Sequence, residues 1–235
     1  MINRSDTGWR LEPSLRTLAL ILGSALLLVG VCLLLGLARG FSLNEISRDP
    51  LATAGLHPLT GAQSQLGVLI WWSAASICLA TWAVLRHTEA NRALVRFFLW
   101  SGLVTAMLAL DDQFQFHDNL ARELLGLRER YVIAVYGIVL GAYFIAFRKV
   151  IRRTEFLLLG LAIVFAALSV AGDLVSQQFV EAGEPSGVGE VLNYAEDALK
   201  LLAIVCWSAY LIRFSLASLR LPRGGEAERE EPTGA

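Results

Sequence analysis

Residues 110–118 read LDDQFQFHD and close an apolar run that begins at about residue 97. A run of this length is typical of a membrane-spanning helix. A charged side chain within such a helix costs roughly 2.5–3.5 kcal/mol on insertion scales. Three carboxylates and one imidazole are therefore expensive at this place in the chain. We interpret the stretch as the centre of a site around which the rest of the chain is arranged.

The composition places the chain among integral membrane proteins. Its 235 residues are 55% hydrophobic and 17% charged. Soluble domains carry about 25% charged residues, so this chain has too few to cover a water-facing surface. The expected partner is the lipid bilayer. Nucleic acid is not expected as a partner, because the sequence has no basic patch with interleaved aromatic residues.

Six apolar runs predict an all-α fold with six transmembrane helices. The first run holds about 20 residues, longer than the roughly 7–15 residues of a signal-peptide core, so we expect it to be a retained span. Polar residues 1–15 form an N-terminal tail, residues 16–215 the membrane bundle and residues 216–235 a disordered tail. A long outer loop, residues 39–66, contains His57 and is expected to pack as a lid or a short interfacial helix. The predicted spans are residues 18–37, 67–85, 97–118, 131–147, 156–178 and 191–214.

The basic residues predict the orientation of these spans. The chain before the first span, the chain from Arg213 onward and the loops after the second and fourth spans hold 14 of the 20 Lys and Arg residues. By the positive-inside rule both termini are therefore cytoplasmic. We expect a multi-pass protein of a bacterial plasma (inner) membrane, with residues 110–118 facing the periplasm or the exterior.

Polar residues of three spans are predicted to meet in the outer leaflet. With this orientation, Asp111 lies near the outer end of the third span, Asp173 near that of the fifth and Glu196 near that of the sixth. Such costly groups are tolerated together when they share one water-lined or ion-filled cavity. The sequence therefore predicts one outward-facing acidic cavity.

Helical spacing predicts which of these side chains share a face. Asp111 and Asp118 are seven residues apart and fall on one face of the third span, whereas Asp112 points elsewhere. His117 forms a neighbouring stripe with Gln113, four residues before it. In the sixth span, one face carries Asn193, Glu196, Asp197 and Lys200. Two plainer interpretations stay open, namely that Glu196 and Lys200 are only an intrahelical ion pair and that Asp118 is only an interface residue.

An imidazole among carboxylates favours a divalent transition metal such as Zn, Mn or Fe over Ca. His117 supplies that imidazole, although a lone interfacial histidine is the alternative. Several carboxylates around one cavity also need a cation, a proton or Lys200 to offset their charge. The predicted metal ligands are Asp111, Asp112, His117, Asp118, Asp173 and Asp197.

Two motifs in this order resemble a group of uncharacterised bacterial multispanning membrane proteins. The first is Asp111-Asp112-x-Phe114-x-x-His117-Asp118, which fits D-D-x-F-x-x-H-[DE], and the second is Glu196-Asp197-x-x-Lys200, which fits [DE]-[DE]-x-x-K. The resemblance covers roughly the second half of the chain. It implies a helical membrane protein and brings no known activity.

The residues support three hypotheses of function. In the first, the cavity binds a cation, either a metal ion or a proton, and Lys200 is a tethered counter-charge that the cation displaces. In the second, the protein is a metal-dependent hydrolase of a lipid or lipid-linked substrate, in which Glu196 is the general base beside a metal-bound water. In the third, the acidic cavity binds another membrane subunit and the role is structural.

Overall fold

The computed structural model describes residues 15–116, 120–126, 128–181 and 186–220. The chain divides into two units, residues 1–60 and 61–235. Throughout the described ranges the regular structure is helical, without β-strands. Five helices are long and apolar enough to cross a membrane, namely Leu18–Ala38, Ala62–Leu85, Arg92–Phe114, Tyr131–Ile151 and Val191–Arg220. The fold is therefore that of an all-helical membrane protein with multiple spans.

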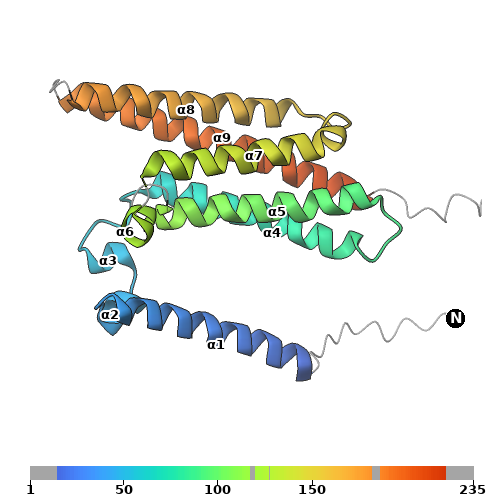
Figure 1. Cartoon of the computed structure of the whole chain (residues 1–235), viewed down its shortest axis with the longest axis horizontal. Helices are drawn as coiled ribbons and strands as arrows, with labels where there is room; N and C mark the ends of the chain where they lie inside the picture. Colours follow the sequence, from blue (N-terminus) through green and yellow to red (C-terminus); the bar gives the residue numbers. More distant parts are fainter. Residues whose placement is uncertain (1–14, 117–119, 127, 182–185, 221–235) are drawn as a thin grey trace, which may run out of the picture. The chain divides into compact units, whose positions relative to one another are not determined.

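From residue 15 on, the first unit consists of one long helix and two short ones (Figure 1). Helix α1 (Leu15–Ala38) exposes most of its leucine side chains, as expected for a helix surrounded by lipid. Helices α2 (Leu43–Ser47) and α3 (Pro50–Thr53) follow. The long loop predicted at 39–66 therefore has helical structure of its own. It is also shorter than predicted, because the next long helix begins at Ala62.

A capping box fixes the start of α2. The backbone N–H of Glu45 donates to Ser42 Oγ (3.3 Å), and the backbone N–H of Ser42 donates to Glu45 Oε2 (2.8 Å). The Ser42 hydroxyl donates to the same carboxylate oxygen (2.7 Å). These hydrogen bonds to the carboxylate hold the pKa of Glu45 below its ordinary value of 4.5. The bond from the Ser42 hydroxyl has the larger effect, and the bond from the Ser42 backbone N–H the smaller.

This capping box predicts a local dependence on pH. Because the folded-state pKa of Glu45 is lowered, the cap is at full strength above 4.5 and is lost as the pH falls through the lowered value. We expect hydrogen exchange at the Ser42 amide, corrected for intrinsic rate, to lose protection on acidification. Glu45→Gln keeps an acceptor without titrating, so its Ser42 protection should not change over the same range. Equal pH profiles in both proteins would contradict the prediction.

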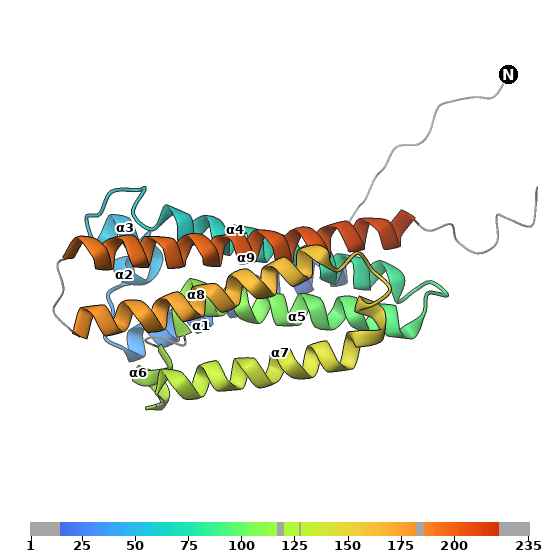
Figure 2. The ribbon, with the colours of Figure 1, turned by 90° about the horizontal axis from the view of Figure 1, so that it is seen from above.

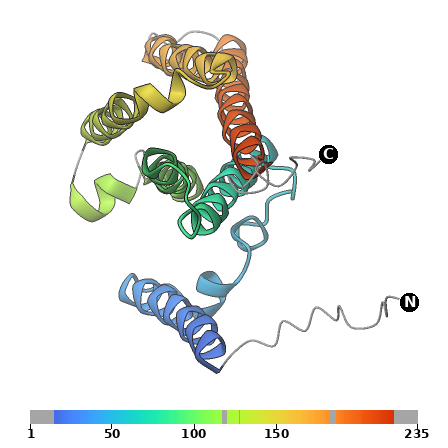
Figure 3. The ribbon, with the colours of Figure 1, turned by 90° about the vertical axis from the view of Figure 1, so that its right-hand side faces the viewer.

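Over its described residues, the second unit is a bundle of five long helices with one short helix beside them (Figures 1 and 2). Helix α8 packs along α9, and α4 packs against both α5 and α9, while α7 lies against α5 (Figure 3). The short helix α6 (Ala121–Leu125) packs on α7. The long helices are α4 (Ala62–Leu85), α5 (Arg92–Phe114), α7 (Glu129–Ile151), α8 (Leu157–Glu181) and α9 (Ser186–Arg220).

The helices of the second unit are held together by an aromatic core in the half that contains the start of α5. Phe97, which is fully buried, contacts the rings of Phe98, Tyr143, Phe147 and Phe214, with centroids 5.3–6.1 Å apart. Its contacts therefore join α5, α7 and α9. Large buried rings in offset or edge-on contact stabilise such a junction beyond the area they bury.

Two pairs of buried polar side chains near this core join neighbouring helices. The hydroxyls of Ser101 and Tyr143 are 2.7 Å apart, and Trp207 Nε1 donates to Thr105 Oγ1 at 3.0 Å. In lipid, such interhelical hydrogen bonds satisfy groups that would otherwise lack a partner. They fix α5 against α7 and α9.

Helix α5 ends earlier than the sequence predicted. Its last residue is Phe114, and Gln115 adopts a left-handed conformation (φ 49°, ψ 46°) with its N–H bonded to the Asp111 carbonyl. A residue in this conformation terminates a helix. The α-helix therefore ends at Phe114, whereas Asp118, which the sequence analysis paired with Asp111, lies outside the described residues.

Candidate functional site

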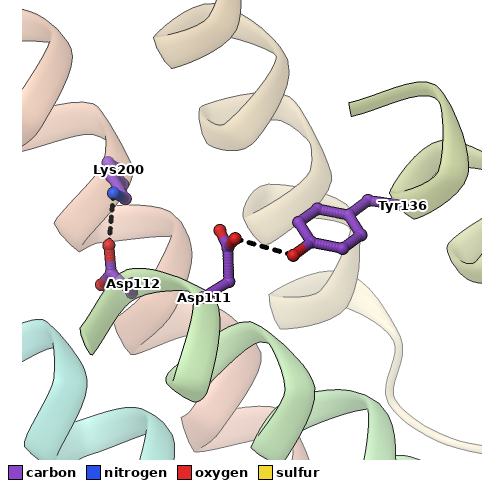
Figure 4. Close-up of polar contacts among 4 residues, drawn as sticks. All are labelled: Asp111, Asp112, Tyr136 and Lys200. Carbon is purple, nitrogen blue, oxygen red and sulfur yellow. Dashed lines mark hydrogen bonds and ion pairs between the residues drawn. The ribbon is translucent and has the colours of Figure 1, made fainter. Parts of the chain in front are cut away.

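The candidate site lies at the carboxyl end of α5, where α4, α7 and α9 approach it. Asp111 and Asp112 are in the last turn of α5, so neighbouring backbone positions point their side chains in different directions. Figure 4 shows Asp111 turned toward α7 and Asp112 turned toward α9. The two carboxylates therefore serve two different contacts between helices.

Asp112 forms an ion pair with Lys200 of α9 (Figure 4). The Asp112 side chain is only 7% exposed, whereas that of Lys200 is 41% exposed. A buried charge is tolerated only when it is paired. Lys200 supplies this pairing at one of the two carboxylate oxygens, Oδ1. The pair links α5 to α9, so Asp112 is turned toward a different helix from Asp111.

The second oxygen of Asp112 lies over α4. A Cβ added at Gly67 would be 3.7 Å from Asp112 Oδ2 and 3.0 Å from Ile204 Cδ1, so glycine allows both neighbours to approach α4. Oδ2 is buried and has no hydrogen-bond partner among the described residues. A carboxylate oxygen in this state has the capacity to accept one further donor or cation.

Asp111 is 8% exposed and links α5 to α7. The hydroxyl of Tyr136 donates to Asp111 Oδ1 at 2.7 Å (Figure 4). A hydrogen bond to a carboxylate is stronger than one between neutral groups, and it orients the acceptor. Together the two aspartates connect α5 with both α7 and α9.

Glu196 lies at the contact between α8 and α9. Its Cβ and Cγ are 3.6 and 3.7 Å from the position of a Cβ added at Gly172 of α8, and the residue is half-buried. Glu196 is one turn of helix before Lys200, whereas Asp197 is exposed. The role of Glu196 as a general base stays a prediction.

The remaining predicted residues are only partly described. His117 and Asp118 lie outside the described residues, and for Asp173 the structure describes the backbone of α8 and not the side chain. His57 is exposed in the loop after α3. Among the side chains that are described, no group of three or more His, Cys, Asp or Glu residues has the spacing of a metal site. Metal binding by the predicted ligands stays a prediction.

Two residues of the site were missed by the sequence analysis. Tyr136 lies in an apolar span and precedes Tyr143 by seven residues, a spacing that places two polar tips on the same core-facing side of a helix. That spacing was a usable signal. Gly67 had no comparable signal, because a single glycine at the edge of a span is common and its role depends on which helix packs beside it.

The fold and this site define a helical, multi-spanning membrane protein with an interhelical ion pair whose carboxylate is buried. Residues 19–214 match the model of a family described as a domain of unknown function, DUF8692. The match covers most of the chain, so the chain belongs to this family. No curated protein and no solved structure matches the chain.

Proposed function

We propose that this chain is a six-span membrane protein that binds a cation, either a metal ion or a proton, at Asp111 and Asp112. Helix α8 would supply the sixth span, since it has 25 residues and is apolar over Leu157–Gly172. Both termini would be cytoplasmic in a bacterial plasma (inner) membrane, and the site would face the periplasm or the exterior. This orientation is supported by the basic residues in the turns at the other end of the second unit.

The observation that carries the proposal is the state of Asp112. Its side chain is 7% exposed, one oxygen is paired with Lys200 and the other has no hydrogen-bond partner among the described residues. A structural ion pair is best satisfied when both oxygens are bonded, because a half-satisfied buried charge is costly. An open oxygen on a buried carboxylate, one residue along α5 from a second buried carboxylate, Asp111, can accept a cation.

Lys200 acts in this proposal as a tethered competitor of the cation. An ammonium group and a cation both compensate the charge of Asp112, and their mutual repulsion disfavours binding of the two together. The Lys200 side chain is 41% exposed, so its ammonium has room to leave Asp112 when a cation binds. Cation binding would then weaken the link between α5 and α9 and leave the Tyr136–Asp111 link to α7 in place.

The test measures cation binding by the purified full chain and three variants. Elemental analysis identifies a metal that is retained, and thermal unfolding at fixed pH with Na⁺, Mg²⁺, Ca²⁺, Mn²⁺ or Zn²⁺ identifies one that is added. The same unfolding series across pH in metal-free buffer detects a proton. The variants are Asp112→Asn, Lys200→Met and a control, Glu155→Gln. The control breaks the ion pair between Glu155 and Arg213, whose side chains are 89% and 69% exposed, respectively.

We expect Asp112→Asn to abolish the response to the cation and Glu155→Gln to retain it. Lys200→Met should bind the cation about tenfold more tightly or better, because a like charge next to the site is removed. A response that survives in Asp112→Asn, or no response to any metal or to protons in the unaltered protein, would refute the proposal.

A further inference from the structure

The end of the second unit opposite the candidate site is strongly basic. Figures 1 and 2 show that the α4–α5 turn, the α7–α8 turn and the carboxyl end of α9 lie at this same end. This end has nine exposed Lys and Arg side chains. Three of them lie within residues 86–96, four within 148–153 and two within 213–220. Against these nine cations the same ranges and the turns between the helices hold two acidic residues, Glu89 and Glu155. We call this surface the basic end.

One cation of the basic end is held in a fixed position. The guanidinium of Arg86 lies 4.8 Å from the ring centroid of Trp82, a cation–π contact, and its Nε donates to His87 Nε2 at 2.9 Å. Trp82 packs against the aromatic core, so the ring that supports Arg86 is itself fixed. The terminal nitrogens of Arg86 have no hydrogen-bond partner among the described residues. A preorganised guanidinium loses little freedom when it binds an anion.

We propose that the basic end binds the headgroups of anionic phospholipids. The basic residues lie at or near the ends of membrane-crossing helices and in the turns between them, which is the depth at which a bilayer presents its phosphates. Arg binds phosphate through two parallel hydrogen bonds, and a cluster of Lys and Arg next to a span attracts anionic lipid. The excess of positive charge selects an anionic over a zwitterionic headgroup. This inference does not rest on the proposed cation site.

The test counts lipids on the detergent-purified full chain by native mass spectrometry. Phosphatidylglycerol and phosphatidylcholine are added to the unaltered protein and to two matched double variants. The first, Arg86→Gln with Arg152→Gln, removes two charges from the basic end. The second, Arg122→Gln with Arg128→Gln, removes two exposed charges around α6, at the opposite end of the unit (Figure 1).

We expect the unaltered protein to prefer phosphatidylglycerol and to lose that preference as the salt concentration rises. Each cation near an anionic lipid contributes about fivefold in affinity, so the first double variant should bind phosphatidylglycerol about 25-fold more weakly. The second should bind it as the unaltered protein does. Equal binding of the two lipids by the unaltered protein, or equal losses in the two double variants, would overturn the inference. Asp112→Asn should keep the lipid preference, which separates this result from the cation test.

Discussion

Replacing Lys200 with methionine is expected to destabilise the folded protein by about 3 kcal/mol. Removing one partner of a buried ion pair leaves the other charge uncompensated, which costs about 3–5 kcal/mol. The lower end of that range applies because the Asp112 side chain is 7% exposed but that of Lys200 is 41% exposed. The measurement is the free energy of unfolding in mixed micelles, in the absence of added metal ions.

Two further variants show whether the loss arises from the unpaired charge. The double variant Asp112→Asn with Lys200→Met should recover most of the stability, because neither charge remains. Breaking the exposed Arg213–Glu155 contact with Glu155→Gln should cost less than about 1 kcal/mol. If the double variant is as unstable as Lys200→Met alone, the ion pair is not the cause of the loss.

Replacing Phe97 with alanine is expected to destabilise the protein by about 3 kcal/mol, as the loss of a large buried ring does in other cores. Phe97 is fully buried and contacts rings from α5, α7 and α9, so three helices lose packing at once. In lipid this lost packing is the main term, because the membrane is as apolar as the side chain itself. Unfolding in the same mixed micelles measures the effect.

The matched control for Phe97 is Phe156, whose side chain is 56% exposed. Phe156→Ala should change the free energy of unfolding by less than about 0.5 kcal/mol. Phe97 and Asp112 are about 22 Å apart along α5, so the effects of Phe97→Ala and Lys200→Met should add. A cost for Phe156→Ala as large as that for Phe97→Ala would contradict the role of the aromatic core.

The helical class of the fold was predictable because long apolar runs have few alternatives in a membrane. The first run, residues 18–37, became α1 (Leu15–Ala38) within a few residues of its predicted bounds. The end of α5 was not predictable in the same way. Glutamine has no special preference for the left-handed conformation that Gln115 adopts, and neither a glycine nor a proline stands next to it to indicate the end of a helix.

The sequence was enough to predict which polar residues belong to the site, but not most of the contacts that they make. The cost of charge in a span singled out Asp111, Asp112 and Lys200 from the sequence. Which carboxylate meets Lys200 depends on the rotation of α5 against α9, which is set by packing at residues such as Gly67. A pattern along one helix contains no information on that rotation. For the same reason, spacing within α9 placed Glu196 one turn from Lys200 but could not show that Asp112 of another helix pairs with Lys200.

The early end of α5 also exposes the site to the electric field of the helix dipole. The peptide dipoles of a helix add up to about half a negative charge at the carboxyl end, and the last turn of α5 contains no basic residue. Asp111 and Asp112 stand in this turn, so the field of the backbone reinforces that of the two carboxylates. A helix that continued to residue 118 would have carried this partial charge further along the chain. By stopping at Phe114, α5 concentrates negative potential where Lys200 now lies, and that potential attracts whichever positive charge comes within reach.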